Sequence, residues 1–170
     1  MSSIRYTPEC IESENCRFVL KQNGKNPLVV LGLNPSTTDA NDSDTTMRRI
    51  MGYVERNGFD SFIMLNLYPQ RATNSNLLDL ELDEGKHMAN LDMMKKVLDG
   101  MSKPTILLAY GDKIRVRRYL RHCLKDIIAV LERYDPSYVK IGAMTNAGNP
   151  RHPSRGPYYE LTDLNINVIR

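Results

Sequence analysis

Residues 27–36, Pro-Leu-Val-Val-Leu-Gly-Leu-Asn-Pro-Ser, carry an apolar run directly into a polar loop. The run at 28–33 holds one glycine and otherwise only aliphatic residues, which is typical of a central strand buried on both faces. Asn34 follows at its end. Ligands bind to open α/β sheets at the edge where parallel strands end. The stretch therefore predicts a buried strand with an amide side chain at the ligand-binding edge of its sheet.

Strand-like and helix-like segments alternate after this stretch. Three further apolar runs predict strands, and apolar residues at helical spacing predict a helix in each interval. Such alternation implies right-handed crossovers, a mostly parallel sheet and helices on both of its faces. We therefore predict an α/β fold, a three-layer α/β/α sandwich with a mostly parallel four-stranded central sheet. The further strands are predicted at 62–67, 105–110 and 138–143, and the helices around 47–54, 88–98 and 116–131.

Both ends of this alternating region carry additional strand signals. Residues 17–22 predict a strand, and Asn23-Gly24 is a turn signal that would join it to the strand at 28–33 as an N-terminal hairpin. Residues 164–168 alternate between polar and apolar side chains and predict a final edge strand.

Length and composition are typical of a protein with one hydrophobic core. The chain has 170 residues, of which 41% are hydrophobic, and a formal net charge of +3. No linker, repeat or low-complexity tract divides it, so we expect a single domain over 1–170 in which 1–15 and 156–170 are peripheral. The positive charge is compatible with a nucleic-acid partner but does not require one.

The cysteine and histidine content bears on the cellular compartment and on metal binding. An odd number of cysteines without metal spacing is typical of a reduced, cytoplasmic protein. No apolar stretch is long enough to cross a membrane, and the polar first sixteen residues are unlike a signal peptide. We expect neither a metal site nor a cofactor, because the possible ligands are scattered. The cysteines are Cys10, Cys16 and Cys123, and the histidines are His87, His122 and His152.

The four predicted strand ends and the loops after them carry Asn34, Asn66, Tyr110 and His152. Because parallel strands end at one edge, we expect these side chains to meet. Asn34 can hold a water without ionising, Asn66 can pair with the edge of a planar heterocycle, and His152 can donate a hydrogen bond to an oxygen that becomes negative. Each also has a structural explanation, in which the asparagines satisfy nearby backbone and the histidine is an ordinary loop residue.

Three short motifs occur here in the order found in a known enzyme superfamily. Residues 32–35 resemble the Gly-x-Asn-Pro motif of the mismatch-specific and single-strand-selective branches of the uracil-DNA glycosylase superfamily. Leu65-Asn66 ends the next strand, and residues 152–154 resemble the His-Pro-Ser motif of the single-strand-selective and classical branches. The chain also resembles, over about residues 16–154, an uncharacterised bacterial and phage family, the domain of unknown function numbered sixteen-forty-three. That resemblance rests on residues 33–37, 46–49, 66–67, 71–73 and 150–153.

The glycosylase resemblance implies a uracil-DNA glycosylase-like fold and hydrolysis of the N-glycosidic bond of a modified or damaged base, with DNA or a nucleotide as the partner. It implies that Asn34 positions the attacking water, that Asn66 reads the base and that His152 binds the carbonyl oxygen of the departing base. Further candidate contacts are Pro35, Ser36, Tyr68, Tyr110 and Ser154 for the base or ligand, and Arg48, Arg71, Thr73, Arg151 and Arg155 for phosphate or DNA.

Two other function classes remain open. Arg48 and Arg71 belong to the pattern of the uncharacterised family and not to that of the glycosylases, and they suggest an anionic ligand. The second hypothesis is therefore a nucleotide- or nucleoside-binding protein or enzyme that holds a phosphate with these arginines, although an ion pair of Arg48 with Asp44 explains one of them structurally. The third hypothesis is a non-catalytic module that binds DNA or another partner. The glycosylase hypothesis has a weak point, because Asn34 is an amide and not a general base.

Overall fold

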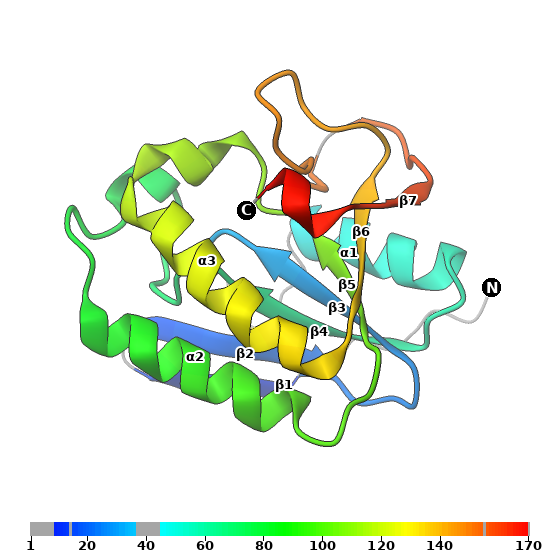
Figure 1. The fold of residues 1–170 in the computed structure, drawn as a ribbon, viewed down its shortest axis with the longest axis horizontal. Helices are drawn as coiled ribbons and strands as arrows, with labels where there is room; N and C mark the ends of the chain where they lie inside the picture. Colours follow the sequence, from blue (N-terminus) through cyan, green and yellow to red (C-terminus); the bar gives the residue numbers. More distant parts are fainter. Residues whose placement is uncertain (1–8, 14, 37–44, 155, 170) are drawn as a thin grey trace.

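The computed structural model describes residues 9–13, 15–36, 45–154 and 156–169, and a seven-stranded sheet forms its centre (Figure 1). The strand order is β1-β2-β4-β3-β5-β6-β7. The inner four strands, β4, β3, β5 and β6, are parallel, whereas β1, β2 and β7 are antiparallel to their neighbours. The bounds are Glu9–Ser13 for β1, Cys16–Gln22 for β2, Pro27–Gly32 for β3, Ser61–Asn66 for β4, Thr105–Leu108 for β5, Ser137–Ile141 for β6 and Leu161–Asp163 for β7.

Strand β3 is buried on both faces, because its side chains enter two separate core clusters. Val29 and Leu31 pack with the apolar residues of α2 and α3, whereas Leu28 and Val30 pack with those of α1. Helices α2 and α3 therefore cover one face of the sheet and α1 the other (Figure 1). The prediction of an α/β sheet with helices on both faces is confirmed. The helices are α1 (Thr45–Arg56), α2 (Glu84–Leu98) and α3 (Tyr119–Leu131).

The predicted hairpin between residues 17–22 and 28–33 is wrong. Strand β2 pairs with β1 and β4, so β4 separates it from β3. The turn after β2 is held at the start of β4 instead, because the Asp60 carboxylate accepts the backbone N–H groups of Lys25 and Asn26, both at 2.9 Å. The N-terminal hairpin is formed by β1 and β2.

The strand predicted at residues 164–168 is also wrong. The last strand, β7, ends at Asp163, and Ile166–Val168 form a short 3-10 helix. Asn165 explains the change, because its side chain accepts the N–H of Asn167 at 3.0 Å and caps that helix. The sheet has one strand more than the six predicted, because β1, from a segment expected to be peripheral, pairs with β2; β7 takes the edge position predicted for residues 164–168.

The carboxyl ends of the parallel strands form one edge of the sheet. Gly32 and Asn66 are register partners at the ends of β3 and β4. Strand β2 runs the opposite way and so begins at this edge, where the Arg17 N–H donates to the backbone of the loop after β4. The N–H of Gly111, after β5, donates to the carbonyl of Pro150 at 3.1 Å. Segments far apart in the sequence are thus joined here by backbone contacts. Within the described ranges, no helix combines the length and the apolarity needed to cross a membrane.

Candidate functional site

A cleft of about 520 Å³ opens at this edge of the sheet. Its volume lies within the range of small-molecule sites, roughly 300–1,000 Å³. Residues that follow β3, β4, β5 and β6 line it. The structure brings nine of the predicted site residues together here, and their roles stay predictions. These nine are Asn34, Pro35, Ser36, Asn66, Thr73, Tyr110, Arg151, His152 and Ser154.

Three predicted site residues do not line the cleft, and Arg155 lies outside the described residues. Tyr68 is fully buried in the core, where its hydroxyl donates to Asp79 at 2.6 Å. Burial and this hydrogen bond raise the pKa of Tyr68 far above its usual value. Arg48 is exposed on α1 and reaches Thr45 Oγ1 at 3.5 Å.

Arg71 is the third predicted residue that does not line the cleft, and it contacts a residue that does. Its Nε donates to the carbonyl of Ser36 at 3.4 Å, and its guanidinium pairs with Glu12 at 3.3 Å. Ser36 itself lines the cleft. Arg71 therefore helps to fix the loop that carries Ser36, which is a different task from the predicted direct contact with a phosphate.

The two asparagines differ in how their amides are used. The Asn34 nitrogen donates to the carbonyls of Pro35 at 3.0 Å and Ala72 at 3.2 Å, which leaves Oδ1 without a hydrogen bond within the described residues. Asn66 is 4% exposed, and its Oδ1 is buried without a partner in the same part of the chain. A Cβ on Gly32 would lie only 2.9 Å from that oxygen, so the glycine makes room for the Asn66 amide. Asn66 is thus a cleft residue with a buried acceptor that has no described partner.

His152 is exposed, and its Nδ1 is engaged by Ser154. Nδ1 accepts the Ser154 backbone N–H at 3.2 Å and lies 2.7 Å from the Ser154 hydroxyl. A neutral imidazole whose Nδ1 accepts hydrogen bonds carries its proton on Nε2. His152 can therefore donate a hydrogen bond to a ligand through Nε2.

The loop that carries His152 is fastened to helix α1. Arg49 Nε donates to the carbonyl of Pro153 at 2.8 Å, and its guanidinium lies 4.0 Å from the ring centroid of Tyr158. Arg56 stacks on the same ring at 3.6 Å, and the ring packs directly on Gly52. Arg49 thus anchors the loop that carries His152.

Asp112 supplies a carboxylate to the cleft that the sequence analysis did not anticipate. Its Oδ1 accepts from the Thr145 hydroxyl at 2.6 Å and from the Asn149 amide at 2.9 Å. These two hydrogen bonds hold the pKa of Asp112 below its ordinary value, so the group is a carboxylate at neutral pH. Its position in the sequence could have predicted this, because Asp112 stands two residues after Tyr110, at the end of a predicted strand.

Cations also line the cleft, and of the three among the described residues two were not predicted. Arg17 is 5% exposed at the start of β2, and Lys113 is exposed after β5. Arg151, which was predicted, donates from Nε to the carbonyl of Ala143 at 2.8 Å. Arg17 was interpreted only as a strand residue, because nothing in the sequence shows that β2 begins at the ligand-binding edge.

The chain matches the family described as "Protein of unknown function (DUF1643)" over residues 17–154. It belongs to this family. No curated protein and no solved structure matched the chain. The matched region begins at Arg17 and ends at Ser154, both of which line the cleft, so all the lining residues that the structure describes lie within it.

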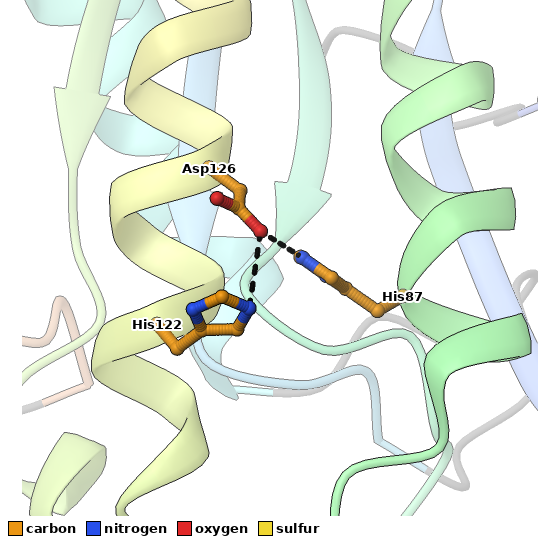
Figure 2. A group of neighbouring side chains, drawn as sticks. All are labelled: His87, His122 and Asp126. Atoms are coloured by element: carbon orange, nitrogen blue, oxygen red, sulfur yellow. Dashed lines mark hydrogen bonds and ion pairs between the residues drawn. The ribbon is translucent and has the colours of Figure 1, made fainter.

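Outside the cleft, one group of side chains in the described part of this DUF1643 chain has the composition of a metal site. His87 on α2 and His122 and Asp126 on α3 lie side by side (Figure 2). The cysteines offer no comparable group: Cys16 and Cys123 are free and buried, and the side chain of Cys10 lies outside the described set. Burial raises the pKa of Cys123 to about 12, which makes it a poor nucleophile.

Proposed function

We propose that this DUF1643 protein binds a nucleobase in the cleft and hydrolyses its N-glycosidic bond, in DNA or in a nucleotide. One observation carries the proposal: two amides, a histidine that can donate through Nε2 and an ionised carboxylate line a single cleft. Each supplies a function that the reaction needs, namely base recognition, stabilisation of the leaving group and handling of the water.

Base recognition is assigned to Asn66. A buried polar atom without a partner destabilises a protein by about 1–3 kcal/mol. The buried Oδ1 of Asn66 would recover that energy by accepting an N–H from the edge of a base. Tyr110 adds an aromatic wall whose hydroxyl stays protonated, because burial raises its pKa. A planar heterocycle with a donor on its edge fits these two residues.

Bond cleavage is assigned to His152, Asn34 and Asp112. The bond between C1′ of the sugar and the base nitrogen breaks, and its electron pair leaves with the base. The His152 Nε2–H donates to the base oxygen on which the negative charge develops, a contribution of the oxyanion-hole kind. Asn34 Oδ1 holds the water, whose oxygen bonds to C1′. The proton from the water passes to the Asp112 carboxylate, which removes the need for Asn34 to act as a base.

The second candidate is nucleotide binding without cleavage, and the cations of the cleft are the observation that supports it. Arg17, Lys113 and Arg151 line the site, whereas Arg48 and Arg71 do not. The phosphate of a nucleotide, or of a DNA strand, would therefore contact a different set of cations from the predicted one. This contact is shared by both candidates, so the discriminating event is release of a free base.

A base-release assay tests the proposal. Single- and double-stranded oligonucleotides with one uracil or one hypoxanthine are incubated with the protein, and free base and abasic sites are measured. We expect release, and a loss of roughly 100-fold or more for His152→Ala, the magnitude typical of an oxyanion donor. Asp112→Asn should also lose activity. Asp60→Asn is the matched control, because Asp60 is likewise a hydrogen-bonded carboxylate but lies at the opposite edge of the sheet.

Two other results would replace the proposal. If no base is released but a mononucleotide binds, and Arg151→Ala or Lys113→Ala weakens that binding while Arg48→Ala does not, the second candidate is correct. If ordinary DNA binds in a salt-sensitive manner that His152→Ala leaves unchanged, the protein is a non-catalytic DNA-binding module.

A further inference from the structure

Two histidines that are 35 residues apart in sequence meet one aspartate between α2 and α3. His87 Nε2 lies 2.7 Å from Asp126 Oδ2, and His122 Nε2 lies 3.3 Å from the same oxygen. One ligand atom from each of the three residues lies within 4.8 Å of the other two. Figure 2 shows both rings directed at this carboxylate from neighbouring helices.

The helices account for this convergence. His122 and Asp126 are four residues apart on α3, a spacing that places both side chains on one face of a helix. His87 lies in the first turn of α2, which packs beside α3 in the same core. The group therefore bridges two helices and is not a local pair within one of them.

We propose that His87, His122 and Asp126 bind a divalent transition-metal ion, Zn²⁺ in the first instance, that clamps α2 to α3. Two imidazole nitrogens and one carboxylate oxygen are a set that Zn²⁺ takes with water in its fourth position. Two neutral imidazoles and a carboxylate carry one negative charge, which a divalent cation neutralises. The site is separate from the cleft, because none of its three residues lines it.

The spacing of the donor atoms suits such an ion. Metal bonds of about 2.0–2.2 Å place two ligand atoms of one ion about 3–4 Å apart. The pairs at 2.7 and 3.3 Å need only small adjustments to reach this spacing. The side chain of His122 is 54% exposed and that of Asp126 is 37% exposed, so both have room to move. His87 is 1% exposed and provides the fixed point.

The burial of His87 determines which of its ring nitrogens faces the cluster. Its Nδ1 is buried without a hydrogen-bond partner in the described part of the chain, so the contacts of this ring's nitrogens are confined to the Nε2 side, at the cluster. A metal bond at Nε2 would return far more free energy than the single hydrogen bond to Asp126.

A bound ion would also stabilise the floor of the cleft. Asn90 lies three residues after His87 on α2, and its amide donates to the carbonyl of Asn66 at 3.0 Å. An ion that fixes the start of α2 would therefore hold the helix that supports Asn66. This role is structural and does not depend on the reaction proposed above.

Metal titration of the full chain tests the inference. Chelator-treated protein is titrated with Zn²⁺ by calorimetry and with Co²⁺ by visible absorption. We expect one ion per chain, and a loss of affinity of roughly 100-fold for His122→Ala and for Asp126→Asn, by analogy with the tenfold to hundredfold losses seen for outer-shell partners alone. His152→Ala is the matched control, because it removes an exposed histidine from the cleft and should leave the titration unchanged.

Thermal unfolding provides a second readout. Zn²⁺ at 100 times its dissociation constant should raise the melting temperature by about 5–10 °C for a chain of this size, and His122→Ala should abolish the shift. Because His122 is half exposed, this variant is expected to fold, whereas His87→Ala opens the core. The inference is overturned if wild type binds no ion, or if His122→Ala and Asp126→Asn bind as wild type does. Either result leaves the base-release assay unaffected.

Discussion

Arg49 Nε donates to the carbonyl of Pro153 across 2.8 Å and so ties helix α1 to the loop that carries His152. The same guanidinium donates to the carbonyl of Pro157 at 3.1 Å. One side chain therefore holds the loop on both sides of its turn, 104 and 108 residues away in sequence. Arg49 thus holds the loop that carries His152 without itself lining the cleft.

Arg49→Ala should release this loop. Loss of the two hydrogen bonds and of the contact with Tyr158 should reduce the free energy of unfolding by about 1–3 kcal/mol. Ligand binding or base release should fall further than stability alone explains. Urea unfolding measures the change in stability, and the base-release or ligand-binding assay measures the change in function. Arg48→Ala is the control and should change stability by less than about 0.5 kcal/mol. Equal effects of the two substitutions would refute the anchoring role.

Gly111→Ala should disturb His152 directly. Gly111 has φ of +68°, which a residue with a Cβ rarely adopts, and its added Cβ would lie 3.0 Å from the Cβ of His152. Gly58→Ala is a matched control, because its φ is +78° and no atom lies within 4 Å of the added Cβ. Both substitutions should destabilise by about 1 kcal/mol through backbone strain. Only Gly111→Ala should also weaken base release or ligand binding. Wild-type base release and ligand binding in this variant would contradict the prediction.

Asp112 should contribute to stability in a pH-dependent manner. Its pKa in the folded protein lies below the ordinary 3.8, because Thr145 and Asn149 donate hydrogen bonds to the carboxylate. A lowered folded pKa means that the contribution is present above about pH 4 and is lost as the pH falls through the folded pKa. The difference in unfolding free energy between pH 7 and pH 3 should therefore be smaller in Asp112→Asn than in wild type.

Asp60→Asn separates the contribution of Asp112 to stability from its contribution to the function of the cleft. Hydrogen bonds from Ser61 and from the backbone of Asn26 and Lys25 lower its pKa as well. Asp60→Asn should also reduce the acid sensitivity of stability, yet leave base release or ligand binding intact. Loss of cleft function in both variants would mean that the effect arises from folding and not from the carboxylate in the site.

The buried cysteines should be unreactive in the folded protein. Burial raises the pKa values of Cys16 and Cys123, the latter to about 12, and only the thiolate reacts. At pH 8, labelling of these two positions with a maleimide should be at least tenfold slower in the native protein than in urea. Peptide mass spectrometry reports each position separately. Rapid native labelling of Cys123 would show that α3 opens readily.

The sequence predicted those parts of the fold that local patterns determine. The apolar run at 28–33 and the three runs after it are long enough to specify central strands. The hairpin prediction failed because Asp60, 34 residues after Asn26, holds the turn against β4, and no local pattern reveals so distant an acceptor.

The candidate site was predictable where a residue ends a predicted strand or lies in the loop that follows one. Asn34, Asn66 and His152 were placed at one edge by strand order alone. Arg17 was not predicted as a cleft residue because its strand, β2, is antiparallel to β4. No pattern within either strand predicts that the two pair. The group of His87, His122 and Asp126 depends on how α2 packs against α3. This packing determines which residues of the two helices lie beside one another, and no local sequence pattern reveals it.

The packing of Tyr158 on Gly52 has a practical consequence for the choice of fragment boundaries. The region matched by the family ends at Ser154, but the ring that Arg49 and Arg56 enclose and the strand β7 both follow it. A fragment trimmed to residues 17–154 would lose the contacts of Tyr158 with α1 and leave one edge of β6 unpaired. Bare strand edges favour association between molecules. Such a fragment is expected to aggregate, although it retains all the described residues that line the cleft.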